Sequence, residues 1–178
     1  DKFITNNDNN FVYVAYESNG LHAYSDDGAG NLTHTSSHIG DGNACGIWGD
    51  GDFIYVANGF GTSQYGSEDA ILEVYSVDDN GLLTSVFTTS SGAAVAGNHV
   101  LGGFGEERGF RSVSGDGTYI YATVNADEMT TPTEGVGGLY VYSVDNAGNL
   151  TFITKSTGLI GAMGVWCDEN FIYMANVH

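Results

Sequence analysis

One six-residue stretch, Phe53-Ile54-Tyr55-Val56-Ala57-Asn58, occurs four times along the chain in slightly different forms. The other copies are Phe11–Ala15 (FVYVA), Tyr119–Thr123 (YIYAT) and Phe171–Asn176 (FIYMAN). Aromatic and aliphatic residues packed into so few positions are typical of a short β-strand. An internal repeat is therefore the feature from which the fold should be derived.

Two further signatures follow the first three copies in a constant order. The first is strand-like (Gly20–Ser25, Ile71–Asp78, Gly138–Asp145), and the second follows a turn of Asp, Asn and Gly residues (Asn31–Thr33, Leu82–Thr84, Asn149–Thr151). One more short segment precedes each copy of the stretch (Phe3–Thr5, Gly46–Asp52, Phe110–Gly117, Gly164–Asn170). The repeated unit thus predicts four short strands joined by tight turns, which is a twisted antiparallel sheet.

A four-stranded unit of about 40 residues has the size of a β-propeller blade, which cannot bury both of its apolar faces alone. A β-sandwich would also contain many short strands, but it gives no reason for the same four strand patterns to recur in the same order. The sequence therefore predicts an all-β fold, a single β-propeller segment over 1–178. Its expected blades are 1–43, 44–108, 109–161 and a partial blade, 162–178.

About three and a half blades would leave exposed sheet edges and open apolar faces. We expect these faces to be covered in a complete ring of about seven blades. The remaining blades would come from sequence beyond this chain, which we favour, or from a second copy of it.

The repeat also resembles a known group, the lactonase-like and YVTN-type surface-protein propellers, whose blades read like "YVAN" followed by "VYSVD..G.LT". The residues that carry the resemblance are Phe53–Asn58 with Val74–Thr84, and Tyr119–Ala122 with Tyr140–Thr151. The resemblance implies a propeller architecture. It says little about chemistry, because members of the group build different sites on the same scaffold.

The charge of the chain excludes some partners. Twenty-two acidic residues against four basic ones give a formal charge of −18, which repels nucleic-acid phosphates and anionic lipid. Acidity, scarce lysine, abundant Thr, Ser, Asn and Gly, and the resemblance to surface proteins predict an extracellular or cell-surface location. Cys45 and Cys167 match no metal-ligand spacing, and we expect buried thiols.

Long inserts fall on one predicted end of the blades, at 59–70, 91–109 and 126–137, and long loops on a rigid scaffold commonly carry binding surfaces. The second insert and the strand after it contain glutamates, a histidine and arginines, which could serve as acid, base and cation. A lactonase-like hydrolase or isomerase would use His99 or a glutamate as general base and an arginine to hold an anionic oxygen. The candidates are His99, Glu106, Glu107, Arg108 and Arg111. The competing interpretation is a solvated, ion-paired surface loop.

Calcium-assisted carbohydrate binding is a third function class, because hard cations require several oxygen ligands at once. The candidate calcium ligands in the inserts are Glu68, Asp69, Asp127, Glu128 and Glu134, and the candidate sugar-stacking rings are Phe60, Tyr65 and Phe104. Most other Asp and Asn residues, such as those in Asp26–Gly28 and Asp78–Gly81, are explained by hairpin turns that need a positive φ.

Histidines and tryptophans complete the candidate residues. Aligning the first predicted hairpin places His22, Tyr24, His34 and His38 on one side of the sheet, with His22 diagonal to His34. We interpret the histidines as outward-facing or packed between blades. Trp48 and Trp166 are expected to fill equivalent space between blades, where the third blade has Val113.

Together these observations predict a non-enzymatic binding or assembly module. It would act through its looped face and open strand edges on a protein partner or on further copies of itself. The lactonase-like enzyme and the carbohydrate-binding propeller are the alternatives.

Overall fold

The computed structural model describes residues 2–6, 10–16, 19–39, 43–59, 71–88, 109–125, 137–156 and 161–176, and every regular element in these ranges is a β-strand. The strands are β1 (Lys2–Asn6), β2 (Phe11–Ala15), β3 (Leu21–Asp26), β4 (Leu32–His38), β5 (Asn43–Gly49), β6 (Phe53–Gly59), β7 (Ile71–Val77), β8 (Leu83–Thr88), β9 (Gly109–Gly115), β10 (Tyr119–Asn125), β11 (Gly138–Val144), β12 (Leu150–Ser156), β13 (Ala162–Cys167) and β14 (Ile172–Asn176). Among the described residues, no helix is long and apolar enough to cross a membrane.

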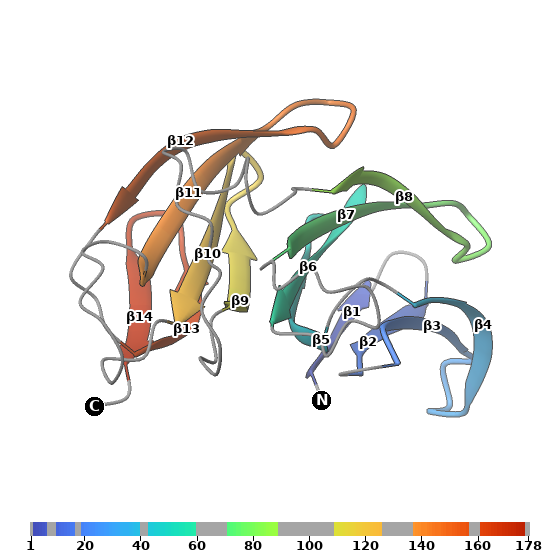
Figure 1. Cartoon of the computed structure of the whole chain (residues 1–178). Coiled ribbons are helices and arrows are strands. Elements are labelled where there is room, and N and C mark those ends of the chain that lie inside the picture. The colour runs from blue at the N-terminus through green and yellow to red at the C-terminus, as the bar shows by residue number, and fades with distance from the viewer. Residues whose placement is uncertain are drawn as a thin grey trace.

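The strands form three four-stranded sheets, β1–β4, β5–β8 and β9–β12, and a two-stranded sheet, β13–β14. Consecutive strands within each sheet pair in antiparallel fashion. The sheets succeed one another around an arc, and the marked N and C ends lie at its open side (Figure 1). The predicted all-β propeller of four-stranded antiparallel sheets is confirmed.

Each sheet has two apolar faces, because successive side chains along a strand point to opposite sides. We call the face toward the next sheet the leading face and the face toward the preceding sheet the trailing face. Phe11, Tyr13 and Ala15 of the first leading face share a buried cluster with Ile54 and Val56 of the second trailing face. A second cluster joins the leading face of β5–β8 to the trailing face of β9–β12 in the same way. Burial between neighbouring sheets therefore supplies the core.

The hairpins between the third and fourth strands of each sheet share one turn. An aspartate at the start of each turn accepts hydrogen bonds from the backbone N–H groups two and four residues later. The aspartates are Asp27, Asp78 and Asp145. A glycine with positive φ follows three residues after each aspartate, at Gly30 (87°), Gly81 (75°) and Gly148 (81°). The predicted turn role of these Asp and Gly residues is confirmed.

These turns make the stability of the protein sensitive to acid. Backbone N–H groups of Leu82 and Asn80 hold the pKa of Asp78 below its ordinary value of 3.8. A lowered native pKa contributes stability above pH 3.8, and this contribution is lost as pH falls through the native pKa. We expect Asp78→Asn to lower the free energy of unfolding at pH 7, measured by urea unfolding, and the difference from the parent protein to disappear as pH falls through the native pKa of Asp78. Asp79→Asn removes the same charge from the same turn, and an equal effect of both variants would contradict the prediction.

A second aspartate motif, which sequence analysis missed, closes the hairpins between the first and second strands. Asp50, Asp116 and Asp168 each accept backbone N–H bonds from the residues two and three positions later and, through the other oxygen, a tyrosine hydroxyl five positions later. Burial and, to a smaller extent, the hydrogen bond to Asp116 raise the pKa of Tyr121 to about 12. Asp8 has the same spacing to Tyr13 in the sequence but lies outside the described residues.

The structure corrects the predicted alignment of the tryptophans. Trp48 lies opposite Tyr55 and Trp166 opposite Tyr173, whereas the residue opposite Tyr121 in the third sheet is Ser114, not Val113. The Asp motif sets this register, because each inner-strand residue stands two positions before its aspartate. Where the second sheet has the ring of Trp48, the third sheet therefore has the small side chain of Ser114.

The prediction that His38 shares a face with His22 and His34 was wrong. The β3–β4 pairing shifts between Ala23 and Tyr24, so Tyr24 opposes His34 while Leu21 opposes His38. The extra residue in β4 reverses the alternation of side chains along the rest of the strand. His38 consequently packs against Tyr75 of the second sheet, with ring centroids 4.9 Å apart.

Candidate functional site

Most of the residues that the sequence singles out lie outside the described residues. This holds for the catalytic candidates His99, Glu106, Glu107 and Arg108, for the rings of Phe60, Tyr65 and Phe104, and for the calcium candidates Glu68, Asp69, Asp127, Glu128 and Glu134. Among the candidate catalytic, sugar-stacking and calcium-binding residues, only Arg111 lies within the described ranges. The candidate site therefore comprises the end of the sheets at which Arg111 lies.

Arg111 occupies a β-bulge at the start of the inner strand β9. Phe110 pairs with Val124 and Ser112 with Thr123, so Arg111 is the extra residue between them. The inner strands β5 and β13 have the same irregularity, with Cys45 and Met163 as the extra residues. These bulges lie at the end of the sheets from which the inserts 60–70 and 126–136 leave, since β6 ends at Gly59 and β10 at Asn125.

A buried carboxylate lies near this end in the second sheet. Glu73 of β7 is 5% exposed and accepts a hydrogen bond of 2.6 Å from Nδ2 of Asn58, which is 1% exposed. Buried carboxylates need such partners, because an unpaired charge is costly away from water. Sequence analysis missed this pair. The available signal was an acidic residue at the place that His22 occupies in the first sheet and Tyr140 in the third.

Arg111 approaches the second sheet at one glycine. Gly59 follows Asn58, and a Cβ at Gly59 would lie 2.7 Å from Sγ of Cys45 and 3.6 Å from a guanidinium nitrogen of Arg111. The absence of a side chain at this position lets the arginine of the third sheet approach the second. The end of the sheets that carries the inserts thus brings a guanidinium and a thiol against one glycine on the leading face of the second sheet. The buried Glu73–Asn58 pair lies on the opposite, trailing face.

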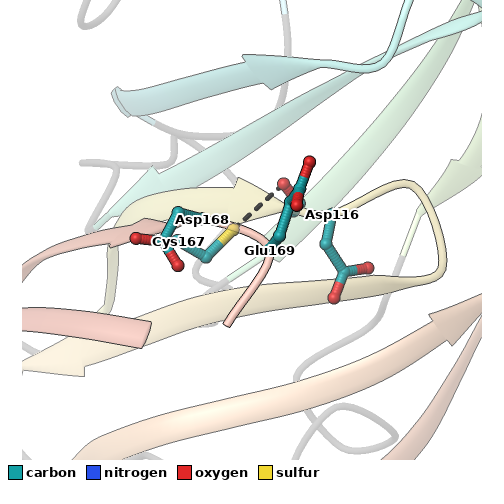
Figure 2. Close-up of a pocket in the computed structure, with 5 residues that line it drawn as sticks. Asp116, Cys167, Asp168 and Glu169 are labelled. Atoms are coloured by element: carbon teal, nitrogen blue, oxygen red, sulfur yellow. Dashed lines mark hydrogen bonds between the residues drawn. The ribbon is translucent and has the colours of Figure 1, made fainter. Parts of the chain in front are cut away.

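A pocket of about 510 Å³ opens at the opposite end, between the third sheet and β13–β14. Gly115, Asp116, Cys167, Asp168 and Glu169 line it. The Cys167 thiol is buried, as predicted, and donates to the Gly115 carbonyl at 3.0 Å, whereas Cys45 is only partly buried. The three carboxylates point in different directions (Figure 2). Asp116 and Asp168 already accept turn and tyrosine hydrogen bonds, so the pocket does not assemble a cation site.

Exposed apolar side chains gather on the leading face of β13–β14. Phe171 is 65%, Trp166 59% and Tyr173 47% exposed, whereas the equivalent Tyr55 in the second sheet is fully buried. Trp166 stacks on Tyr173, with ring centroids 5.2 Å apart. These aromatic rings are exposed at positions that the third sheet covers on the second sheet, so they form a candidate interaction surface.

The trailing face of the first sheet, at the other end of the arc, is also exposed. Leu32 is 51% exposed, whereas its equivalents Leu83 and Leu150 are each 8% exposed. A Cβ at Gly81 would strike the Phe11 ring of the preceding sheet, and one at Gly148 would strike Phe53, but no other described residue approaches Gly30 in this way. Within the chain, an aromatic ring packs against the turn glycine of the next sheet twice, as Phe11 does on Gly81 and Phe53 on Gly148. At the ends of the arc, one sheet exposes such a ring and the other exposes such a turn.

Comparisons with known proteins support the architecture. No family model and no curated sequence match the chain. A crystal structure of a protein from Lactobacillus plantarum superposes with a TM-score of 0.69 at 16% identity, covering 98% of this chain and 47% of that one. A chain from a Saccharomyces cerevisiae complex of Dbp5 with Nup159, Gle1, IP6 and ADP gives 0.52 at 14% identity, covering 87% and 36%. This chain spans about half or less of these structures, and the likeness supports a β-propeller fold alone.

Proposed function

We propose that the chain is a non-enzymatic propeller module for binding and assembly, extracellular or at a cell surface. Of the two sources of further blades considered above, we adopt the second copy, whose trailing face would pack against the leading face of β13–β14. The observation that carries this proposal is the exposure of Phe171, Trp166 and Tyr173 at positions whose equivalents are covered in the second sheet. The location is supported by the formal charge of −18.

The contact between neighbouring sheets indicates how the copies would meet. Within the chain, the aromatic residue that begins a second-strand segment packs against the turn glycine of the next sheet, as Phe11 does on Gly81 and Phe53 on Gly148. Phe171 is the corresponding ring in the last sheet, and Gly30 is the corresponding glycine in the first. A second copy would thus place its Gly30 turn over Phe171.

This arrangement joins unlike faces. All three sheet junctions in the described part of the chain pair a leading face with a trailing face, the third through Ser114 and Cys167. Continuity of the packing therefore favours a head-to-tail contact over a symmetric one. A head-to-tail contact either closes into a ring or continues as an open array. The symmetric alternative, in which two β13–β14 sheets meet, would put Phe171 against another ring instead of a glycine turn.

Sedimentation velocity over a range of concentrations tests the assembly. We expect the parent chain to self-associate, and Phe171→Asp and Trp166→Ser each to weaken association about tenfold or more, as for buried aromatic anchors. Serine is the residue that the third sheet has at this place, Ser114. Leu82→Asn is the matched control, because Leu82 is 54% exposed in a turn where the other two sheets have asparagine. A parent chain that stays monomeric, or an equal effect of Leu82→Asn, would overturn the proposal.

Mixing two defective chains tests the polarity. Phe171→Asp spoils only the leading end and Leu32→Asp only the trailing end, so each variant alone should fail to associate. Together they should form a one-to-one complex through their intact faces. Association of the Leu32→Asp chain with itself would instead indicate a symmetric contact and would exclude the head-to-tail arrangement.

A further inference from the structure

A pair of histidines lies on the trailing face of the first sheet, the face to which Leu32 also belongs. His22 is on β3 and His34 on β4, in the outer half of the sheet (Figure 1). Their ring centroids are 5.5 Å apart, and their planes are inclined by 54°. Tyr24 opposes His34 in the pairing, so the two histidines are diagonal neighbours on one face.

The hydrogen bonding of His22 determines which nitrogen carries its proton. Nε2 lies 3.0 Å from the backbone carbonyl oxygen of Asn19. A carbonyl can only accept, so Nε2 donates, and in the neutral ring Nδ1 is left with its lone pair. Nδ1 is shielded from solvent and has no hydrogen-bond partner among the described residues. A buried acceptor without a donor carries a cost that calls for an explanation.

We infer that His22 and His34 form a site for one zinc or similar transition-metal ion, with Nδ1 of His22 as a ligand. A bond from one imidazole nitrogen to a carbonyl is the arrangement that orients metal-binding histidines and leaves the other nitrogen for the ion. Two imidazoles that share a tetrahedral zinc at Zn–N distances of 2.0–2.1 Å have ring centroids about 5 Å apart. The observed 5.5 Å is close to this separation.

The surroundings restrict the class of ion. Imidazole nitrogens suit zinc, copper and nickel, whereas calcium and magnesium prefer oxygen ligands. No cluster of three or more His, Cys, Asp or Glu side chains suited to a metal occurs in the part of the chain that the structure describes. The protein would therefore supply two ligands, and water or a partner group would complete the coordination.

Zinc chloride alone is the probe for this site. Isothermal titration calorimetry is done with the full chain in excess magnesium, which occupies exposed carboxylates but competes poorly for imidazole. We expect saturable zinc binding that His22→Gln and His34→Phe each weaken at least about 10–100-fold, because loss of a direct ligand should cost no less than loss of an outer-shell partner. The phenylalanine copies Phe152, which opposes Tyr142 as His34 opposes Tyr24, so packing is preserved.

His38→Asn is the matched control, because His38 is on the same strand but packs against Tyr75 on the other face. Its zinc affinity should equal that of the parent chain. A second readout is the nitrogen-15 shift of the His22 ring, in which Nδ1 and not Nε2 should move on zinc addition. Unchanged affinity in the His22→Gln, His34→Phe double variant, or zinc shifts confined to other histidines, would overturn the assignment.

Discussion

Gly81→Ala should destabilise the protein by about 2–5 kcal/mol, because two separate costs combine at this position. The φ of Gly81 is 75°, a left-handed conformation that costs an L-residue about 1–2 kcal/mol. The new methyl group would also lie 2.6 Å from Cδ1 of Phe11. Phe11 is 7% exposed and packed between sheets, so moving it adds about 1–3 kcal/mol of overpacking. Urea unfolding monitored by circular dichroism measures the total.

Gly30→Ala separates the two costs. Gly30 occupies the same place in the first turn and has a φ of 87°, but among the described residues, its two chain neighbours aside, no atom lies within 4 Å of the added Cβ. Only the conformational cost of about 1–2 kcal/mol should remain. The comparison is made at a low protein concentration, so that self-association does not contribute. Equal losses in the two variants would show that the Phe11 contact does not constrain the junction between sheets.

Tyr142→Ala should cost about 3–5 kcal/mol, the range for truncating a large aromatic side chain in a core. Tyr142 is 1% exposed and packs edge-on against Phe152, with ring centroids 5.8 Å apart. It also belongs to the cluster that joins the second and third sheets. Removal of the ring would leave a cavity at that junction, and thermal unfolding should show a correspondingly lower midpoint.

Tyr24 provides the comparison, because it has the same place in the first sheet but is only partly buried. Its ring contacts His34, with centroids 5.4 Å apart, and no preceding sheet covers it in the described part of the chain. Tyr24→Ala should therefore cost about 1 kcal/mol, in proportion to the smaller buried area. A loss as large as that of Tyr142→Ala would contradict the assignment of an open trailing face.

The architecture could be predicted from the sequence because the repeat encodes each strand and turn locally. Phe53–Asn58 and its copies correspond to second strands, and the Asp and Gly residues at 78–81 and 145–148 form the expected turns. The Asp-to-Tyr hydrogen bond was also present as a constant spacing, since Asp50, Asp116 and Asp168 each stand five residues before a tyrosine. It was missed because these aspartates were interpreted only as turn residues.

The positions of individual side chains were harder to predict, because bulges change the alternation without leaving a clear signal. One extra residue in β4 moves His38 to the opposite face from His34. The pairing of Asn58 with Glu73 joins residues 15 positions apart on neighbouring strands, and only the register brings them together. The catalytic and calcium candidates other than Arg111 fall outside the described residues and stay predictions.

The bulges of the inner strands have a consequence for how such a protein can change. At one backbone position, repeated in three successive sheets, the chain presents a thiol at Cys45, a guanidinium at Arg111 and a thioether at Met163. The extra residue is left out of the ladder pairing, so its identity is not fixed by a cross-strand neighbour. Substitution at this position can therefore change the side chain presented at the insert-bearing end of one sheet, while the ladder hydrogen bonds of every sheet stay the same.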